Sequence, residues 1–205
     1  MNVLLIHGLG RTPLSLAGLS NHLVQSGYQT ESFGYAAFAE PYEQIVARLR
    51  NKLRQLSTLG PYGIVAHSLG GVLTRSALAV SELTLPQHVV MLGPPNQPPR
   101  LAEWAWNLWP FQWFSGTCGE SLASAKFYKT LPSLQTAYTI IAGTSGPRGP
   151  WSPFGTDVND GMVALNETRI SAADQPIEFP GIHGFMMNQP KVQVAISQVL
   201  QQARS

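Results

Sequence analysis

Residues 63–73 read GIVAHSLGGVL, so that an apolar run passes through a turn of small residues into a helical pattern. The apolar run is too short for a helix and has the composition of a buried strand. Ser68 stands at the turn, with Ala66 two residues before it and Gly70 two residues after it. A serine on so sharp a turn needs small residues at those positions, because the strand and the helix approach each other closely. The pattern is typical of a nucleophile elbow.

Two interpretations of Ser68 are open. In the first, the serine caps the following helix, which is a common role for this residue type. In the second, it is a nucleophile, and the helix dipole together with the backbone N–H of Leu69 stabilises an oxyanion. The strand-turn-helix context favours the nucleophile, although Ala66 replaces the glycine that is commoner there. His67 is not expected to be the base, because neighbouring side chains on a strand point to opposite faces.

The rest of the chain alternates the same two patterns, with short apolar runs between amphipathic helical stretches. Continuous apolar strands that alternate with helices are typical of a mainly parallel sheet buried on both faces. We therefore expect one α/β domain over residues 1–205, with helices on both faces of the sheet. The expected strands are 3–6, 62–66, 88–92, 138–142 and 176–180, and the expected helices are 15–25, 41–56, 70–80 and 190–203.

Charged residues make up only 12% of the 205 residues, and the net charge is +2. So little charge argues against disorder and against a nucleic-acid partner. The single cysteine cannot form an intrachain disulfide, and no Cys or His cluster has the spacing of zinc ligands. Residues 157–161 resemble a calcium loop but lack its alternating ligands and closing glutamate, so we expect no metal. Without a signal peptide or a membrane-spanning run, a cytoplasmic location is the default expectation.

A glycine-flanked loop follows the first expected strand and reads HGLG over residues 7–10. Such a loop is free to turn a second backbone N–H toward Ser68, and we assign this second oxyanion donor to Leu9. We expect His7 to fix the loop by hydrogen bonds rather than to act as a base.

These segments resemble the serine esterases and lipases of the α/β-hydrolase superfamily, and most nearly the small bacterial lipase-like proteins. In that family the elbow serine is the nucleophile, the aspartate of an Asp-Gly segment orients a histidine, and this late histidine is the base. The resemblance implies that these residues are Ser68, Asp160 and His183. The chain departs from the family at residues 98–99, where Pro-Pro replaces Gly-Ser. The matching motifs are HG at 7–8, AHSLGG at 66–71, VMLGPPNQ at 90–97, NDGMV at 159–163 and HGFMM at 183–187.

The chain order serine, acid, histidine is independently that of an α/β hydrolase, and the acid and the histidine each follow an expected late strand. In this arrangement His183 takes the proton of Ser68, and a buried carboxylate holds the tautomer of the imidazole. Asp157 and Glu178 remain alternatives to Asp160 as the acid. A purely structural histidine remains the alternative for His183.

Residues 101–114 read LAEWAWNLWPFQWF and hold four of the five tryptophans. We take residues 98–118 as a candidate cap over the pocket, with Trp104, Trp106 and Trp109 as candidate substrate contacts. Packing of these rings on the core of the domain is the alternative. No basic face accompanies the aromatic residues, so we expect no strong membrane anchor.

The sequence therefore predicts a serine hydrolase that cleaves small or medium esters of apolar acyl groups through an acyl-enzyme, without a cofactor. Because the chain is short, we expect a minimal lid or none. Thioesters and amides need the same machinery, so a thioesterase or an amidase is an alternative. The alternative from another class is a catalytically silent α/β-hydrolase fold that binds a ligand. The sequence does not indicate an oligomeric state.

Overall fold

A computed structural model describes residues 1–80, 83–106 and 109–204, without the side chains of residues 103–105 and 109–114. Its strands form one wholly parallel sheet in the order β2-β1-β3-β4-β5-β6. The predicted α/β class with a parallel sheet is therefore confirmed. The strands are β1 Asn2–Ile6, β2 Gln29–Phe33, β3 Tyr62–His67, β4 His88–Leu92, β5 Tyr138–Gly143 and β6 Ile177–Phe179.

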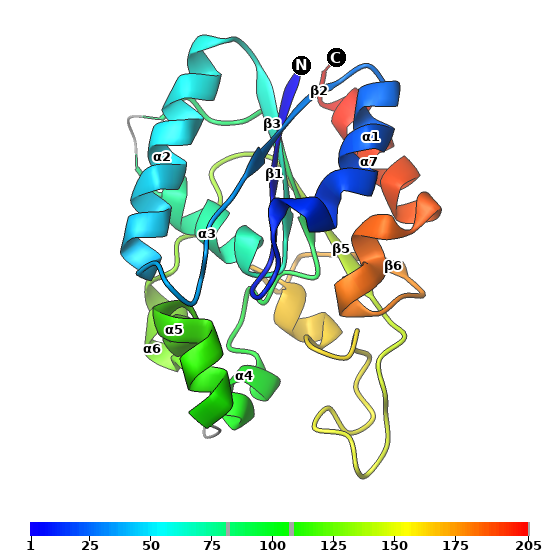
Figure 1. Cartoon of the computed structure of the whole chain (residues 1–205). Helices are drawn as coiled ribbons and strands as arrows, with labels where there is room; N and C mark the ends of the chain where they lie inside the picture. Colours follow the sequence, from blue (N-terminus) through cyan, green and yellow to red (C-terminus); the bar gives the residue numbers. More distant parts are fainter. Residues whose placement is uncertain (81–82, 107–108, 205) are drawn as a thin grey trace.

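Helices cover both faces of this sheet (Figure 1). On one face lie α1 (Ala17–Gln25) and α7 (Pro190–Gln202), and on the other lie α2 (Tyr42–Thr58) and α3 (Leu69–Ala77). These are the four helices expected from the sequence, with ends shifted by up to three residues. The first begins as a short 3-10 turn, η1 (Pro13–Leu16).

The central strands are buried on both faces, which is why they read as continuous apolar runs. In β1, Leu4 and Ile6 pack into the cluster under α2 and α3, whereas Val3 and Leu5 pack into the cluster under α1 and α7. All four side chains are fully buried. Full burial of one such side chain contributes about 1.5–3 kcal/mol to stability, so the core packing holds β1 firmly in the sheet.

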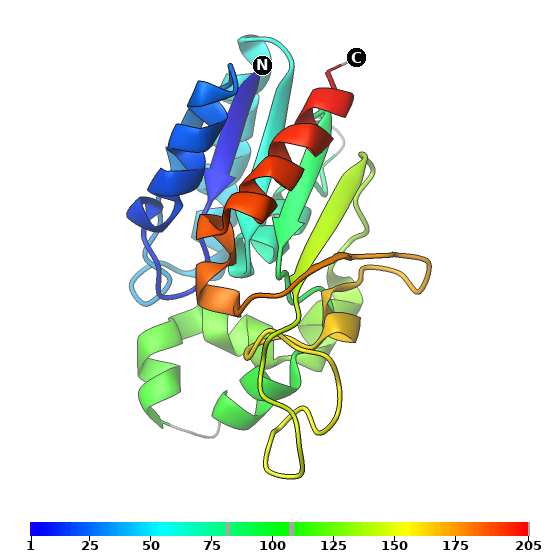
Figure 2. The same ribbon diagram turned by 90° about the vertical axis from the view of Figure 1, so that its right-hand side faces the viewer.

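Two parts of the fold were not expected from the sequence. The edge strand β2 is mostly exposed and reads QTESF, so it lacks the apolar run that marks the other strands. Three helices, α4 (Arg100–Trp106), α5 (Trp109–Ala123) and α6 (Ala125–Thr130), lie beyond the carboxyl ends of the strands (Figure 2). The segment 98–118, expected as a cap, thus contains α4 and most of α5.

Two 3-10 turns, η2 (Leu165–Thr168) and η3 (His183–Asn188), complete the elements at this end of the sheet. Within the described part of the chain, no helix combines the length and the apolar character that crossing a membrane requires.

Candidate active site

Ser68 occupies a strained turn between β3 and α3. Its φ and ψ angles are 53° and −122°, and it is the only non-glycine residue with a positive φ in the described part of the chain. Such a conformation costs of order 1–3 kcal/mol and persists only when the surroundings enforce it. Here the backbone N–H of Ser68 donates to the carbonyl of Leu92 at the end of β4, 2.9 Å away. The carboxyl end of β4 therefore holds the serine at the point where α3 begins.

Gly70, the small residue two positions after Ser68, is required by the close approach of α3 to β1. A Cβ added at Gly70 would lie 2.7 Å from the carbonyl oxygen of Ile6 and 2.8 Å from that of His7. Both contacts are with backbone, which cannot move aside cheaply. The sequence pattern around Ser68 therefore has the steric cause that was expected of an elbow.

His183 and Asp160 complete a hydrogen-bonded line that starts at Ser68. The Nε2 atom of His183 lies 2.9 Å from Ser68 Oγ, and its Nδ1 lies 2.7 Å from Asp160 Oδ2. A carboxylate only accepts, so Nδ1–H donates to Asp160 and Nε2 is left to accept the serine proton. The other carboxylate oxygen, Oδ1, accepts the backbone N–H groups of Met162 at 3.0 Å and Val163 at 2.8 Å. Asp160 is thus fully hydrogen-bonded although it is buried.

The backbone also ties the acid to the histidine. The N–H of His183 donates to the carbonyl oxygen of Asp160 at 2.8 Å. Gly93, which follows β4 with a φ of 53°, packs behind the pair. A Cβ there would lie 2.9 Å from Asp160 Oδ2 and 3.0 Å from His183 Nδ1. Gly93 is a site residue that the sequence reasoning missed, although a glycine directly after a buried strand is a recognisable signal.

The two alternative acids lie elsewhere. Asp157 is about half exposed and forms an ion pair with Arg100 at 2.8 Å. Glu178 is exposed on the edge strand β6. Of the three carboxylates left open by the sequence, the structure therefore brings only Asp160 to His183.

His67 contacts the backbone of His183 rather than the hydroxyl of Ser68. Its Nε2 lies 3.0 Å from the carbonyl oxygen of His183, to which it donates, and its ring is tilted against the ring of His183. Burial, and then the neighbouring His183, hold the pKa of His67 well below its usual range. It is His183 Nε2 that contacts Ser68 Oγ, whereas His67 Nε2 is bonded to the backbone of His183; the role of His183 as the base stays a prediction.

The loop after β1 contacts the serine directly. A Cβ added at Gly8 would lie 2.9 Å from Ser68 Cβ, so only glycine lets the loop come this close. Leu9 follows it and lines the cavity above Ser68. Leu69 is the first residue of α3, where backbone N–H groups have no partner within the helix. Leu69 thus adjoins Ser68 and Leu9 lines the same cavity, and their role as oxyanion donors stays a prediction.

His7 fixes this loop, as the sequence reasoning expected. Its Nδ1 lies 3.0 Å from the carbonyl oxygen of Gly8, and its Nε2 accepts the N–H of Tyr35 at 3.4 Å. The ring stacks on that of Tyr35 with centroids 4.2 Å apart. Burial lowers the pKa of His7, which favours the neutral form that these two hydrogen bonds need.

Ser68 and His183 open into a cavity of about 580 Å³ at the carboxyl edge of the sheet. Its wall is mainly apolar, and part of it comes from α4 and α5. No group of three or more His, Cys, Asp or Glu side chains that could hold a metal occurs in the part of the chain described. The residues that form the apolar wall include Pro95, Pro99, Leu101, Ala102, Leu122 and Val163.

The helices α4 and α5 contribute to the cavity wall, but the one predicted tryptophan contact whose side chain is described does not. Trp106 is half-buried and is not among the residues that line the cavity. It packs beside Gly119, where an added Cβ would lie 3.2 Å from its ring. For Trp106 the structure favours the packing alternative, because the ring lies against α5 and not in the cavity wall. The side chains of Trp104 and Trp109 lie outside the described residues.

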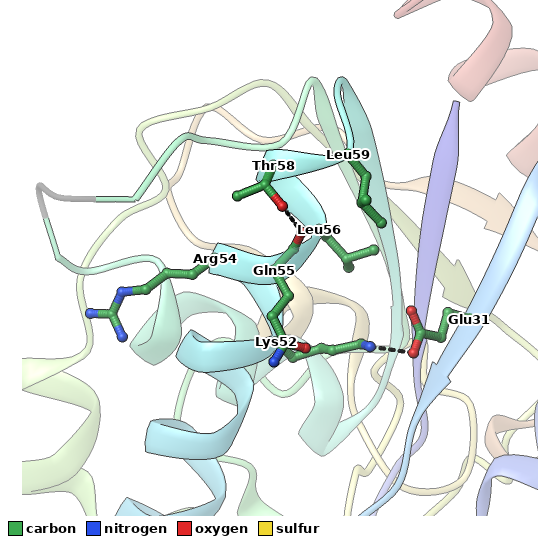
Figure 3. A pocket seen from close by; sticks show the side chains of 7 residues that line it. All are labelled: Glu31, Lys52, Arg54, Gln55, Leu56, Thr58 and Leu59. Atoms are coloured by element: carbon green, nitrogen blue, oxygen red, sulfur yellow. Dashed lines mark hydrogen bonds and ion pairs between the residues drawn. The ribbon is translucent and has the colours of Figure 1, made fainter.

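A second depression, of about 440 Å³, lies at the C-terminal end of α2 (Figure 3). Lys52 and Glu31 form an ion pair there. No serine, cysteine or histidine is among its described lining residues, so we assign it no chemistry. These lining residues are Glu31, Lys52, Arg54, Gln55, Leu56, Thr58 and Leu59.

Comparisons with known proteins agree with this architecture. No protein-family model matches the chain, and no curated protein matches it. Among solved structures, it is similar to the RedJ thioesterase of the prodiginine pathway of Streptomyces coelicolor, with 13% identity, a TM-score of 0.66 and coverage of 97% of this chain and 88% of that one. An extracellular α/β-hydrolase from a Paenibacillus species is similar at 18% identity and a TM-score of 0.62, over 99% of this chain and 98% of that one.

Phospholipase PlaB from Legionella pneumophila is similar at 14% identity and a TM-score of 0.71, over 98% of this chain but only 60% of that one. Identities this low establish the fold alone. The chain has the α/β-hydrolase fold, with Ser68 at the elbow that this fold provides.

Proposed function

We propose that this protein is a serine hydrolase that cleaves carboxylic esters of apolar acyl groups through an acyl-enzyme on Ser68. The observation that carries the proposal is the hydrogen-bonded line from Ser68 Oγ through His183 to Asp160. A serine that merely capped α3 would need neither a histidine in contact with its Oγ nor a strained φ. The side chain of Ser68 in fact makes no capping hydrogen bond to α3.

In the acylation step, Ser68 Oγ attacks the ester carbonyl carbon while His183 Nε2 takes the serine proton. The carbonyl oxygen gains the negative charge and lies against the N–H groups of Leu9 and Leu69. One such donor is typically worth about 3–4 kcal/mol in the transition state. His183 then gives its proton to the leaving alcohol, and Asp160 stabilises the imidazolium in between.

Deacylation repeats these steps with water. His183 Nε2 takes a proton from a water molecule as its oxygen attacks the acyl carbon, and the same two N–H groups hold the oxyanion. The proton then returns to Ser68 Oγ as the acid leaves. The products are the carboxylic acid and the free enzyme, so the cycle needs no cofactor.

The apolar wall of the cavity supports an apolar acyl group. Leu101, Ala102 and Leu122 come from α4 and α5, so these helices serve as part of the acyl site although Trp106 does not. A volume of about 580 Å³ suits short and medium chains better than emulsified long-chain fat.

The proposal is tested with the stopped-flow hydrolysis of 4-nitrophenyl butyrate. We expect a burst of nitrophenol equal to one per chain, followed by slower turnover, and an acyl adduct on the intact protein when the reaction is quenched early. Ser68→Ala should abolish both. A folded wild-type protein without burst or turnover on any ester would favour the catalytically silent alternative. The kcat/KM values for matched butyryl ester, thioester and amide substrates then show which of the three bonds the protein cleaves best.

A further inference from the structure

Arg11 stands at the mouth of the same cavity as Ser68. It follows Leu9 by two residues in the loop after β1, and its exposed side chain lines the cavity. Its Nη2 donates to the carbonyl oxygen of Gly184 at 3.2 Å. A Cβ added at Gly184 would lie 2.4 Å from this Nη2, so the glycine leaves the space that the guanidinium uses.

The charge of Arg11 is not neutralised by any ion pair among the described residues. It is also the only arginine, lysine, aspartate or glutamate among the described residues that line this cavity. A guanidinium carries five N–H donors, and the bond to Gly184 uses one of them. A mainly apolar cavity thus has one charged side chain among its described lining residues, and most N–H donors of this guanidinium are not used by the bond to Gly184.

The position of Arg11 relative to His183 indicates which part of an ester it meets. His183 must lie beside the leaving oxygen in order to return a proton to it. Arg11 binds the carbonyl of Gly184, the residue directly after His183. Arg11 is therefore tied to the backbone next to the residue that would protonate the leaving group, whereas α4 and α5 provide part of the apolar wall.

We propose that Arg11 selects esters whose leaving alcohol carries an oxyanion, either a carboxylate or a phosphate. A planar guanidinium binds both groups through paired N–H donors, so the shared chemistry is an anion within reach of the alcohol oxygen. The proposal rests on the proposed function, because it assumes ester cleavage at Ser68.

Two matched pairs of soluble butyryl esters test the selection and separate the two anions. The carboxylate pair is the butyryl ester of 3-hydroxybenzoate and that of 3-hydroxybenzamide. The phosphate pair is butyryl glycerol phosphate and butyryl glycerol. The measured quantity is the ratio of kcat/KM for the anionic ester to that for its neutral partner, so a general loss of activity cancels.

We expect a ratio above one for the wild type in at least one pair, which identifies the anion that is recognised. Arg11→Gln should lower this ratio roughly fivefold, as removal of a partly exposed charge contact would, and Arg11→Glu should lower it further. Raising the ionic strength should shrink the wild-type preference, because salt screens an exposed charge. Arg54→Glu is the matched control, since Arg54 lies at the distant depression of Figure 3 and should leave both ratios unchanged.

The outcomes distinguish the two proposals. Turnover of the neutral esters with ratios that do not respond to Arg11→Gln or Arg11→Glu would overturn the role of Arg11 and leave ester hydrolysis intact. Ratios that fall equally in Arg54→Glu would also overturn it, because the effect would then come from net charge. A wild type that hydrolyses neither member of either pair would contradict the proposed function, and the role of Arg11 with it.

Discussion

Gly93 packs directly behind Asp160, so closely that a Cβ at position 93 would lie 2.9 Å from Asp160 Oδ2. The same atom would lie 3.0 Å from His183 Nδ1. The hydrogen bond between the acid and the histidine therefore depends on a glycine at the end of β4. We expect Gly93→Ala to lower kcat for a butyryl ester by about 10²-fold or more, since misplacement of a catalytic group by about 1 Å costs that much.

A matched control separates this displacement from backbone strain. Gly93 and Gly27 both have a positive φ, 53° and 83°, but a Cβ at Gly27 would meet nothing within 4 Å. We expect both alanine variants to lose roughly 1 kcal/mol or more of stability in urea unfolding. Only Gly93→Ala should lose activity. Equal kcat values for the two variants would show that Gly93 does not shape the site.

Asp160 should carry the function of the acid, and Asp157 should not. Asp160→Asn removes the acceptor that fixes the His183 tautomer, so we expect the rate of acylation to fall by about 10³–10⁴-fold. Asp157→Asn breaks only a half-exposed ion pair with Arg100 and should change that rate by no more than a few fold. Pre-steady-state bursts of both variants measure the two rates. A larger loss at position 157 would contradict the assignment.

Ala102 offers a test of the acyl wall. It lies on α4 and lines the cavity, so Ala102→Phe should fill part of the space that an acyl chain uses. We expect kcat/KM to fall at least about tenfold for an octanoyl ester and to change little for an acetyl ester, which serves as the internal control. A parallel loss for both chain lengths would mean that α4 does not bind the acyl group.

Stability should fall as the pH rises above 9. Burial raises the pKa of Cys118 from 9.0 to about 12 and that of Tyr62 from 10.0 to about 12. Both groups stay neutral in the folded chain while the unfolded chain ionises. The stability they contribute is therefore complete below pH 9 and is lost toward pH 12, at about 1.4 kcal/mol per pH unit for each group.

Urea unfolding at pH 8, 9, 9.5 and 10 measures this loss. Cys118→Ala removes one of the two groups, so its free energy of unfolding should fall less steeply than that of the wild type between pH 9 and 10. Identical slopes for the two proteins would show that Cys118 ionises equally easily in the folded chain.

The sequence predicted the central strands because their environment is uniform. β1, β3, β4 and β5 lie inside the sheet, largely covered on both faces, so their residues form apolar runs. β2 has a neighbour on one side only, and its exposed QTESF gives no such run. The helices over residues 100–130 were missed because their apolar residues are spread around the helix rather than gathered in one stripe.

The sequence placed Ser68 and His183 by motif and chain order but left the acid open. Asp157 and Asp160 are three residues apart, and local geometry separates them. Asn159 Oδ1 accepts the N–H of Gly161 at 2.8 Å and closes a turn around Asp160, which meets His183, whereas Asp157 precedes this turn and meets Arg100. Contacts between distant segments decide this arrangement, so a single sequence does not show it. The assignment of Ser68, Asp160 and His183 as a catalytic triad stays a prediction.

Covalent labelling tests the central claim most directly. The protein is incubated with a fluorophosphonate, and the intact mass and the modified peptide are then determined by mass spectrometry. The proposed hydrolase should take up one label per chain, on Ser68, and a folded Ser68→Ala variant should take up none. An unlabelled wild type, or a Ser68→Ala variant that is labelled equally well, would contradict the assignment of Ser68 as the nucleophile.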